Sequence, residues 1–304
     1  MDQTVSVYEE RGLMMKLTMN KGALVKMGVN TKVDHPKMKG SWHGYDGRAR
    51  MTIGTGGITW SHAIGDSCMK IAGDHVEPGV SMANPGGSEN TAVQFLSCVG
   101  NRVRVLNGDA KGALGIVTGT HGGVDHTMAW FAPEDLKKMD GSENFLITAY
   151  GQGLKVSETP DVFYMNLDPD LAEAMELEAD EQGNLIFPVA AVIPSFLMGA
   201  GLGSSTLMTG DYDIMTQDHE ANEKYGINKL RLGDFVAISD HDCENGPHYK
   251  EGAVSVGVIV HSDSFTSGHG PGVTMLATSA KGKIKPVLSE KANLADYKDL
   301  IRRD

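Results

Sequence analysis

Residues 101–131 read NRVRVLNGDAKGALGIVTGTHGGVDHTMAWF, and this stretch decides the fold class of the 304-residue chain. Val103 and Val105 alternate with polar residues and lead into Asn107-Gly108-Asp109; two more β-branched runs follow, separated by glycine-rich turns. Alternation with a period of two, punctuated by Gly, Asn and Asp, is typical of short antiparallel strands. We therefore predict a compact group of strands here that continues to residue 150.

Similar runs recur on both sides of this stretch, whereas helical patterns are few. Strands are expected at residues 4–8, 13–19, 50–53, 94–98, 102–106, 114–118, 127–131, 145–150, 235–239, 254–261 and 273–278. Helices are expected after Asp168-Pro169, over residues 218–225, and from Ser289 to the end. The expected fold is mainly β: a multi-domain β-barrel or sandwich with a few peripheral helices.

Residues 101–150 also differ in composition from the flanking chain, which is richer in His, Asp and Gly. They resemble the KOW-type, SH3-like small barrel of translation factors and ribosomal proteins, a resemblance that implies a fold and not a function. It assigns to Gly112 and Gly115 the sharp bending of two strands. We predict that residues 96–155 form this barrel, inserted into a discontinuous β-rich domain of residues 1–95 and 156–304.

The composition excludes several classes of protein. Lys and Arg number 27 against 39 Asp and Glu, a net charge of −12, which disfavours nucleic acid and anionic membranes as partners. The 3 cysteines are too few and too widely spaced for a disulfide framework, so we expect a cytoplasmic protein. Residues 182–210 carry no charge, but their prolines and glycines predict a buried strand (185–193) and a glycine-rich loop (199–204) rather than a membrane span.

The densest polar motif is GDHVEPG at residues 73–79. In an extended chain His75 and Glu77 share one face, and an imidazole with a carboxylate suits zinc, manganese or iron. The alternative is a turn in which Asp74 caps a backbone amide and Pro78-Gly79 reverses the chain.

Further histidines lie at strand ends and in glycine-rich loops. Ser239-Asp240-His241-Asp242 follows an apolar strand; such a cluster is costly to bury unless it is paired or metal-bound, and the alternative is a solvated loop. His261 ends another apolar strand, and His269 stands between glycines; a satisfied half-buried histidine and a mobile loop are the respective alternatives. His121 and His126 flank Gly122-Gly123 and converge only if the chain folds back; a hairpin with surface histidines is the alternative.

Several longer motifs carry a second resemblance. They are AGDHVEPGVS (72–81), NGDAKG (107–112), YGQGLK (150–155), NLDPDL (166–171), DYDIM (211–215), SDHD (239–242) and SGHGPGV (267–273). From about residue 52 to about residue 297 the chain resembles an uncharacterised bacterial family, domain of unknown function 4438. The resemblance implies a β-rich, multi-domain cytoplasmic protein and assigns no residue a role.

The function favoured by these motifs is a metal-assisted hydrolase or lyase that acts on a small polar metabolite. The expected cofactor is a divalent metal, namely zinc, manganese or calcium, and a homo-oligomer is compatible with the sequence. The expected metal ligands are His75, Glu77, His241 and His261, and the expected catalytic residues are Asp74, Asp240, His241, Asp242 and His269. The alternative is a non-enzymatic module that uses the SH3-like barrel to bind RNA or protein; residues 101–150 oppose RNA with six acidic residues against five Lys and Arg.

Overall fold

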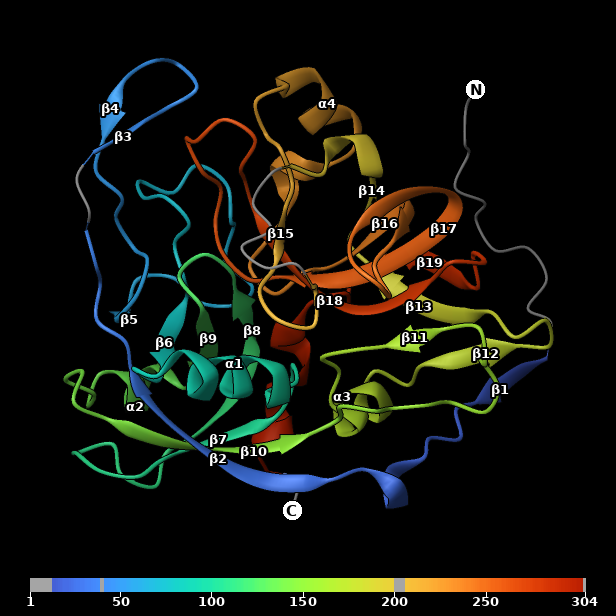
Figure 1. Cartoon of the computed structure of the whole chain (residues 1–304), viewed down its shortest axis with the longest axis horizontal. Helices are drawn as coiled ribbons and strands as arrows, with labels where there is room; N and C mark the ends of the chain where they lie inside the picture. Colours follow the sequence, from blue (N-terminus) through green and yellow to red (C-terminus); the bar gives the residue numbers. More distant parts are fainter. Residues whose placement is uncertain (1–12, 39–40, 200–205, 303–304) are drawn as a thin grey trace.

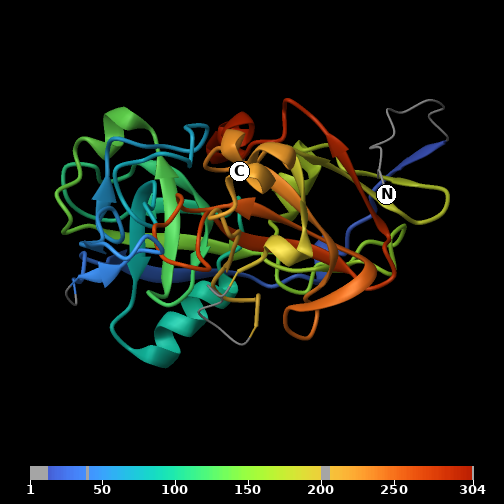
Figure 2. The ribbon, with the colours of Figure 1, turned by 90° about the horizontal axis from the view of Figure 1, so that it is seen from above.

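A closed β-barrel and a region of two sheets make up the chain (Figure 1). The computed structural model describes residues 13–38, 41–199 and 206–302. Seen from above, the barrel occupies one end of the molecule and the smaller sheet lies toward the other (Figure 2). The mainly β fold with a small barrel is confirmed.

The barrel contains six antiparallel strands. Their order is β2 (Lys26–Val33), β10 (Asn144–Tyr150), β7 (Arg102–Val105), β8 (Leu114–His121), β9 (His126–Phe131) and β6 (Gly79–Ala83), and β6 pairs with β2 to close the circle. A two-residue strand, β5 (Ile58–Thr59), adds to β6. The barrel thus takes two strands, β2 and β6, from outside residues 96–155.

The other region holds a six-stranded and a four-stranded sheet. The first runs β11 (Phe163–Tyr164), β18 (Gly272–Ser279), β17 (His248–Ile259), β16 (Phe235–Asp242) and β14 (Ala191–Pro194), with β15 (Tyr212–Asp213) also paired to β18. The second runs β1 (Met14–Lys16), β12 (Glu178–Asp180), β13 (Leu185–Val189) and β19 (Ile284–Leu288). Most pairs are antiparallel; β13–β19 and β14–β16 are parallel.

The two regions share a hydrophobic core across β8 and β9. Successive side chains of a strand point to opposite faces. Val117 and Phe131 therefore enter the barrel interior, whereas Ile116 and Trp130 pack with Val258 and other residues of the six-stranded sheet. Both faces of these two strands are buried, which holds the barrel in one position against the sheet.

The two glycines assigned to strand bending have different roles. Gly112 has a φ of +91°, as its turn requires, with open space around its Cα. At Gly115 a Cβ would lie 2.2 Å from the carbonyl oxygen of Trp130, so only glycine permits this approach of β8 to β9.

The remaining elements are short. They are the helices α1 (Gly87–Leu96), α2 (Pro133–Leu136), α3 (Pro169–Ala174) and α4 (His219–Lys224), the 3-10 helices η1 (Lys21–Ala23), η2 (Ser195–Leu197), η3 (Ile227–Lys229) and η4 (Leu294–Arg302), and the hairpin of β3 (Trp42–His43) and β4 (Ala49–Arg50). The Asp168 side chain caps α3 by accepting a hydrogen bond from the Asp170 amide, as expected. Among the described helices, none is long and apolar enough to cross a membrane.

Some expected elements were wrong. Residues 94–98 do not form a strand: most of them end α1, whose start lacks a side-chain cap that would signal a helix. The single strand expected over 185–193 divides between β13 and β14, which belong to different sheets. The final helix is of the 3-10 type and begins at Leu294 rather than Ser289. The strand expected at 4–8 and most of the loop at 199–204 lie outside the described residues.

Candidate metal centre

Histidine and aspartate side chains from both regions converge where the barrel meets the six-stranded sheet. Three overlapping groups place their potential ligand atoms within 4.8 Å of one another. The groups are His75, His121 and His261; His75, Asp213 and His269; and Asp211, Asp213 and His261. Four of these six residues lie more than 80 positions from the other two in sequence, so only the tertiary structure assembles them.

Hydrogen bonds between the two regions fix this junction. At the end of β8 the Thr120 amide donates to the Thr274 hydroxyl (3.0 Å), and the Thr120 hydroxyl donates to the Gly210 carbonyl (2.8 Å). The amide of Gly122 donates to Asp211 Oδ1 (2.8 Å). These contacts place His121 of the barrel beside Asp211 of the sheet region.

The closest approach in the centre joins His261 and Asp211. His261 Nδ1 donates to the backbone carbonyl of Ser262 (2.9 Å), which directs Nε2 toward the carboxylates. His261 Nε2 lies 2.7 Å from Asp211 Oδ2 and 3.5 Å from Asp213 Oδ1. Nevertheless, His261 Nε2 and Asp211 Oδ2 are both buried atoms without an aligned hydrogen bond. Buried polar atoms are nearly always satisfied, so this pair is a candidate for binding a shared ligand.

The pKa shifts of the groups around this pair are also consistent with a bound cation. Burial lowers the pKa of His261, but Asp211 and Asp213 more than reverse this effect and raise it well above its usual value. Burial likewise works against ionisation of Asp213, yet the nearby imidazoles of His261, His269 and His75 hold its pKa well below the usual range. The ionised carboxylates are therefore stabilised by a positive charge close to them, which a proton on the histidine or a metal ion can supply.

The strand β15 and the residue before it direct both carboxylates into the centre. Asp211 and Asp213 are two positions apart and so share one face of the extended chain, whereas Tyr212 points the other way. Gly272 of β18 faces them: a Cβ there would lie 1.8 Å from Asp211 Oδ2 and 2.2 Å from His261 Nε2. Glycine at this position leaves the space that the centre occupies.

His75 is held by a carboxylate behind it. Its Nδ1 bonds to Asp74 Oδ2 (2.9 Å), and Asp74 Oδ1 accepts from the Ser264 hydroxyl (2.7 Å). His75 Nε2 then faces Asp213 Oδ2 at 3.4 Å. Burial lowers the pKa of His75, but the bonds to Asp213 and Asp74 raise it to about 9. A carboxylate behind a histidine is a common support of metal ligands, so Asp74 acts as a positioning residue.

Glu77, which was expected to bind the metal directly, has no oxygen free to do so. This fully buried carboxylate accepts from the Gly56 amide (2.7 Å), the Ser81 hydroxyl (2.5 Å), His121 Nδ1 (2.5 Å) and His126 Nδ1 (2.9 Å). Burial opposes its ionisation, but His126 and His121 hold its pKa well below the usual value. Glu77 therefore orients His121, whose Nε2 remains available as a ligand.

The second histidine that bonds to Glu77, His126, connects it to another carboxylate. His126 lies between Glu77 and Asp34, whose Oδ2 is 3.0 Å from His126 Nε2. Burial lowers the pKa of His126, but these two carboxylates raise it overall.

By contrast, burial and the neighbouring His261 lower the pKa of His121, which favours the neutral form that binds metals.

His269 occupies the more open side of the centre. Its Nδ1 lies 2.9 Å from Asp213 Oδ2 and 3.3 Å from His75 Nε2. Its side chain is 29% exposed, compared with 15% for His75 and 0% for His261. Gln217 holds the loop by donating to the His269 carbonyl (2.9 Å).

The structure does not bring Asp240, His241 or Asp242 to this centre. His241 Nδ1 bonds to the Ser255 hydroxyl (2.8 Å), burial lowers its pKa to about 4, and its ring packs on Tyr212 at 5.5 Å. Because Tyr212 points away from the aspartates beside it, His241 lies on the far side of β15. His241 was expected to be a metal ligand, but among the described residues it belongs to none of the groups that could hold an ion.

Both aspartates beside His241 have local roles. Asp240 accepts from the Gly252 amide (2.7 Å) at a strand bulge, and Asp242 accepts from the Thr278 hydroxyl (3.0 Å). The sequence motif SDHD is thus a hydrogen-bonded strand end.

Three residues of the centre were not among the expected site residues: His121, Asp211 and Asp213. The Asp-Tyr-Asp spacing was the available signal for the aspartates, because it puts two carboxylates on one strand face. For His121, the signal was its position at the end of an apolar strand before two glycines. Neither pattern identifies a partner 90 or more residues away.

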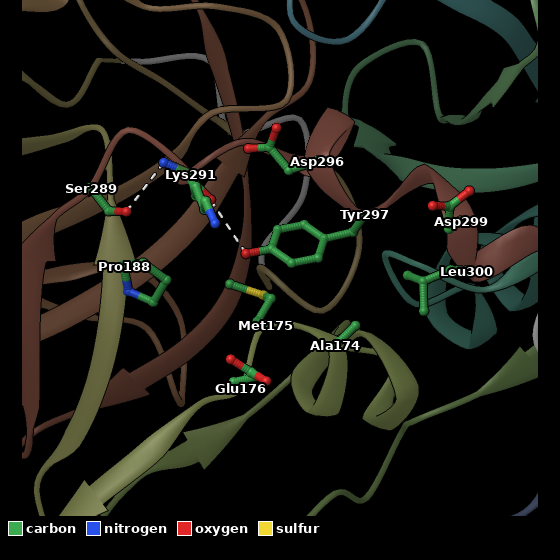
Figure 3. Close-up of a pocket in the computed structure, with 10 residues that line it drawn as sticks. All are labelled: Ala174, Met175, Glu176, Pro188, Ser289, Lys291, Asp296, Tyr297, Asp299 and Leu300. Carbon is green, nitrogen blue, oxygen red and sulfur yellow. Dashed lines mark hydrogen bonds between the residues drawn. The ribbon is translucent and has the colours of Figure 1, made fainter.

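A cavity of about 600 Å³ lies elsewhere (Figure 3). It is lined by Ala174, Met175, Glu176, Pro188, Ser289, Lys291, Asp296, Tyr297, Asp299 and Leu300. Tyr297 donates to the Lys291 carbonyl across it (3.3 Å), and no residue of the metal centre lines it. Its side chains come from α3, β13 and the C-terminal segment and do not converge on one point.

Comparisons with known proteins agree with this architecture. Residues 43–173 match the family model described as domain of unknown function DUF4438, N-terminal, and residues 174–298 match the C-terminal model of the same name. The chain is similar to a solved structure titled "Crystal structure of TM1086", with 44% identity, a TM-score of 0.88, and coverage of 93% of this chain and 99% of that one. No curated protein matches the chain. His75 and His121 fall in the N-terminal match and the other four residues of the centre in the C-terminal match.

Proposed function

Because the chain belongs to the DUF4438 family, whose description names no activity, we propose a function from the site itself: metal-assisted hydrolysis or elimination on a small polar molecule. The observation that carries the proposal is the buried pair of His261 Nε2 and Asp211 Oδ2, 2.7 Å apart and without an aligned hydrogen bond. A divalent ion bound by Asp211, Asp213 and His261 satisfies both atoms.

The donor set indicates which ions fit. Two carboxylates and an imidazole, with the further imidazole of His121 beside them, suit zinc or manganese. Calcium prefers an all-oxygen shell, so the histidines make it the weakest of the three expected ions.

The chemistry follows from the position of the ion. Such an ion makes a bound water acidic near neutral pH or polarises a substrate oxygen. Asp74 and Glu77 hold the imidazoles of His75 and His121 in fixed orientations, and the buried walls exclude bulk water on the His261 side. Substrate therefore approaches from the side of His269, where the centre is exposed.

The alternative, a barrel that binds RNA or protein, has less support. The outward faces of β8 and β9 pack against the six-stranded sheet and are not free for a partner. The net charge of −12 also opposes affinity for RNA.

Elemental analysis of protein purified without added metal tests the proposal. We expect zinc or manganese in the wild type and in His219→Ala, an exposed control on α4, and its loss in His261→Ala. Metal-dependent turnover should then be sought on small esters, amides and phosphate monoesters. A metal-free wild type whose melting temperature does not change on adding zinc or manganese would overturn the proposal.

A further inference from the structure

We propose that the centre binds two divalent cations bridged by the carboxylate of Asp213. This inference rests on the proposed function, because it adds a second ion to the one assigned there. The first ion lies with Asp211 and His261, and the second with His75 and His269.

The two oxygens of Asp213 face different partners. Oδ1 lies 3.5 Å from His261 Nε2 on the buried side. Oδ2 lies 2.9 Å from His269 Nδ1 and 3.4 Å from His75 Nε2 on the open side. A carboxylate that directs one oxygen to each of two donor sets has the geometry of a bridging ligand.

One ion cannot use all six residues of the centre. Ligands on a single ion with bonds of about 2.1 Å are separated by no more than roughly 4.2 Å. Within the described chain, each group that fits inside 4.8 Å has three members, and Asp213 is the one residue common to the group with Asp211 and the group with His269. Filling both groups therefore requires two ions.

Supporting contacts prepare the donors on both sides. His261 uses Nδ1 for the Ser262 carbonyl, and His75 uses Nδ1 for Asp74, so each directs Nε2 toward Asp213. His121 lies with its ring 4.2 Å from that of His261 and 5.5 Å from that of His75, which assigns it to the first ion. The first site is thus buried and the second is open to solvent and substrate.

Two ions also narrow the reaction class. A metal pair about 3.5–4 Å apart is suited to hydrolysis, in which it contacts the attacking and leaving oxygens.

Manganese is the probe for this inference, because two adjacent Mn²⁺ ions give a spin-coupled electron paramagnetic resonance spectrum. The experiment loads full-length protein with Mn²⁺ alone and measures bound metal per chain together with the spectrum. We expect two ions per chain and a coupled spectrum in the wild type and in His219→Ala. His269→Ala should retain one ion with an uncoupled spectrum.

The possible results separate the two proposals. One tightly bound ion in the wild type, with an uncoupled spectrum, overturns the bridged pair and leaves the proposed function standing. No bound Mn²⁺ overturns the bridged pair, and the proposed function is overturned with it if Zn²⁺ does not bind either. Because the decisive measurement is made on the wild type, a misfolded variant does not affect the outcome; near-ultraviolet circular dichroism verifies the fold of His269→Ala.

Discussion

Substituting Gly272 by alanine adds one methyl group at the centre. The Cβ would lie 1.8 Å from Asp211 Oδ2, 2.2 Å from His261 Nε2 and 2.6 Å from His261 Cδ2. Ordinary contact begins near 3.4 Å, so the Asp211 oxygen must retreat by about 1.6 Å. The φ of Gly272 is outside the left-handed region, so the backbone itself accepts alanine without strain.

This displacement acts on two proposed ligands at once. A ligand set must be held within about 0.5 Å of its working geometry, and loss of a single supporting contact already costs about 10–100-fold in metal affinity. We therefore expect Gly272→Ala to weaken metal binding by at least about 100-fold. Overpacking should also lower the stability of the metal-free protein by about 1–3 kcal/mol.

The assay is competition for Zn²⁺ or Mn²⁺ against a chelator of known affinity, with urea unfolding of the metal-free protein beside it. The matched control is Gly87→Ala in the first turn of α1, where an added Cβ meets no atom within 4 Å. The control should bind metal like the wild type. Wild-type affinity in Gly272→Ala would refute the assignment of Asp211 and His261 as ligands.

Three further changes test other parts of the structure. Glu77→Gln removes a buried charge that two histidines share, so urea unfolding should show a loss of about 3–5 kcal/mol, and an unchanged midpoint would contradict this role. His241→Ala removes the hydrogen bond to Ser255 at a distance from the centre. We expect the free energy of unfolding to fall by about 1–3 kcal/mol while the metal content stays full, and loss of metal would show that His241 is a ligand after all. Burial raises the pKa of Asp168 to about 6 from 3.8. Between about pH 4 and 6 the folded state therefore keeps Asp168 protonated while the unfolded state loses this proton, so the free energy of unfolding falls by about 3 kcal/mol as pH rises through this range. Asp168→Asn should flatten this pH dependence. An equally steep pH dependence in the variant would assign the effect to other groups.

Local patterns were sufficient for four of the six strands of the barrel, β7 to β10, and for part of the centre, whereas β2 and β6 were not predicted. Alternation at Val103 and Val105 identified β7 because a strand exposes its two faces in turn. His75, His261 and His269 were identifiable because histidines at strand ends or between glycines are held where a ligand can reach them. Family membership, too, followed from contiguous motifs.

Only the tertiary structure decided which of these groups meet. Barrel closure pairs β2 with β6, and the packing of β8 against β18 brings His121 to Asp211, contacts between segments far apart in the chain. Contacts within the barrel and its adjoining loop surround Glu77 with four donors and so make it a support rather than a ligand, whereas His241 packs against Tyr212, away from the centre. The sequence determines the chemistry that each motif offers, but long-range packing determines its neighbours, and neighbours decide whether a histidine binds an ion or fills a core.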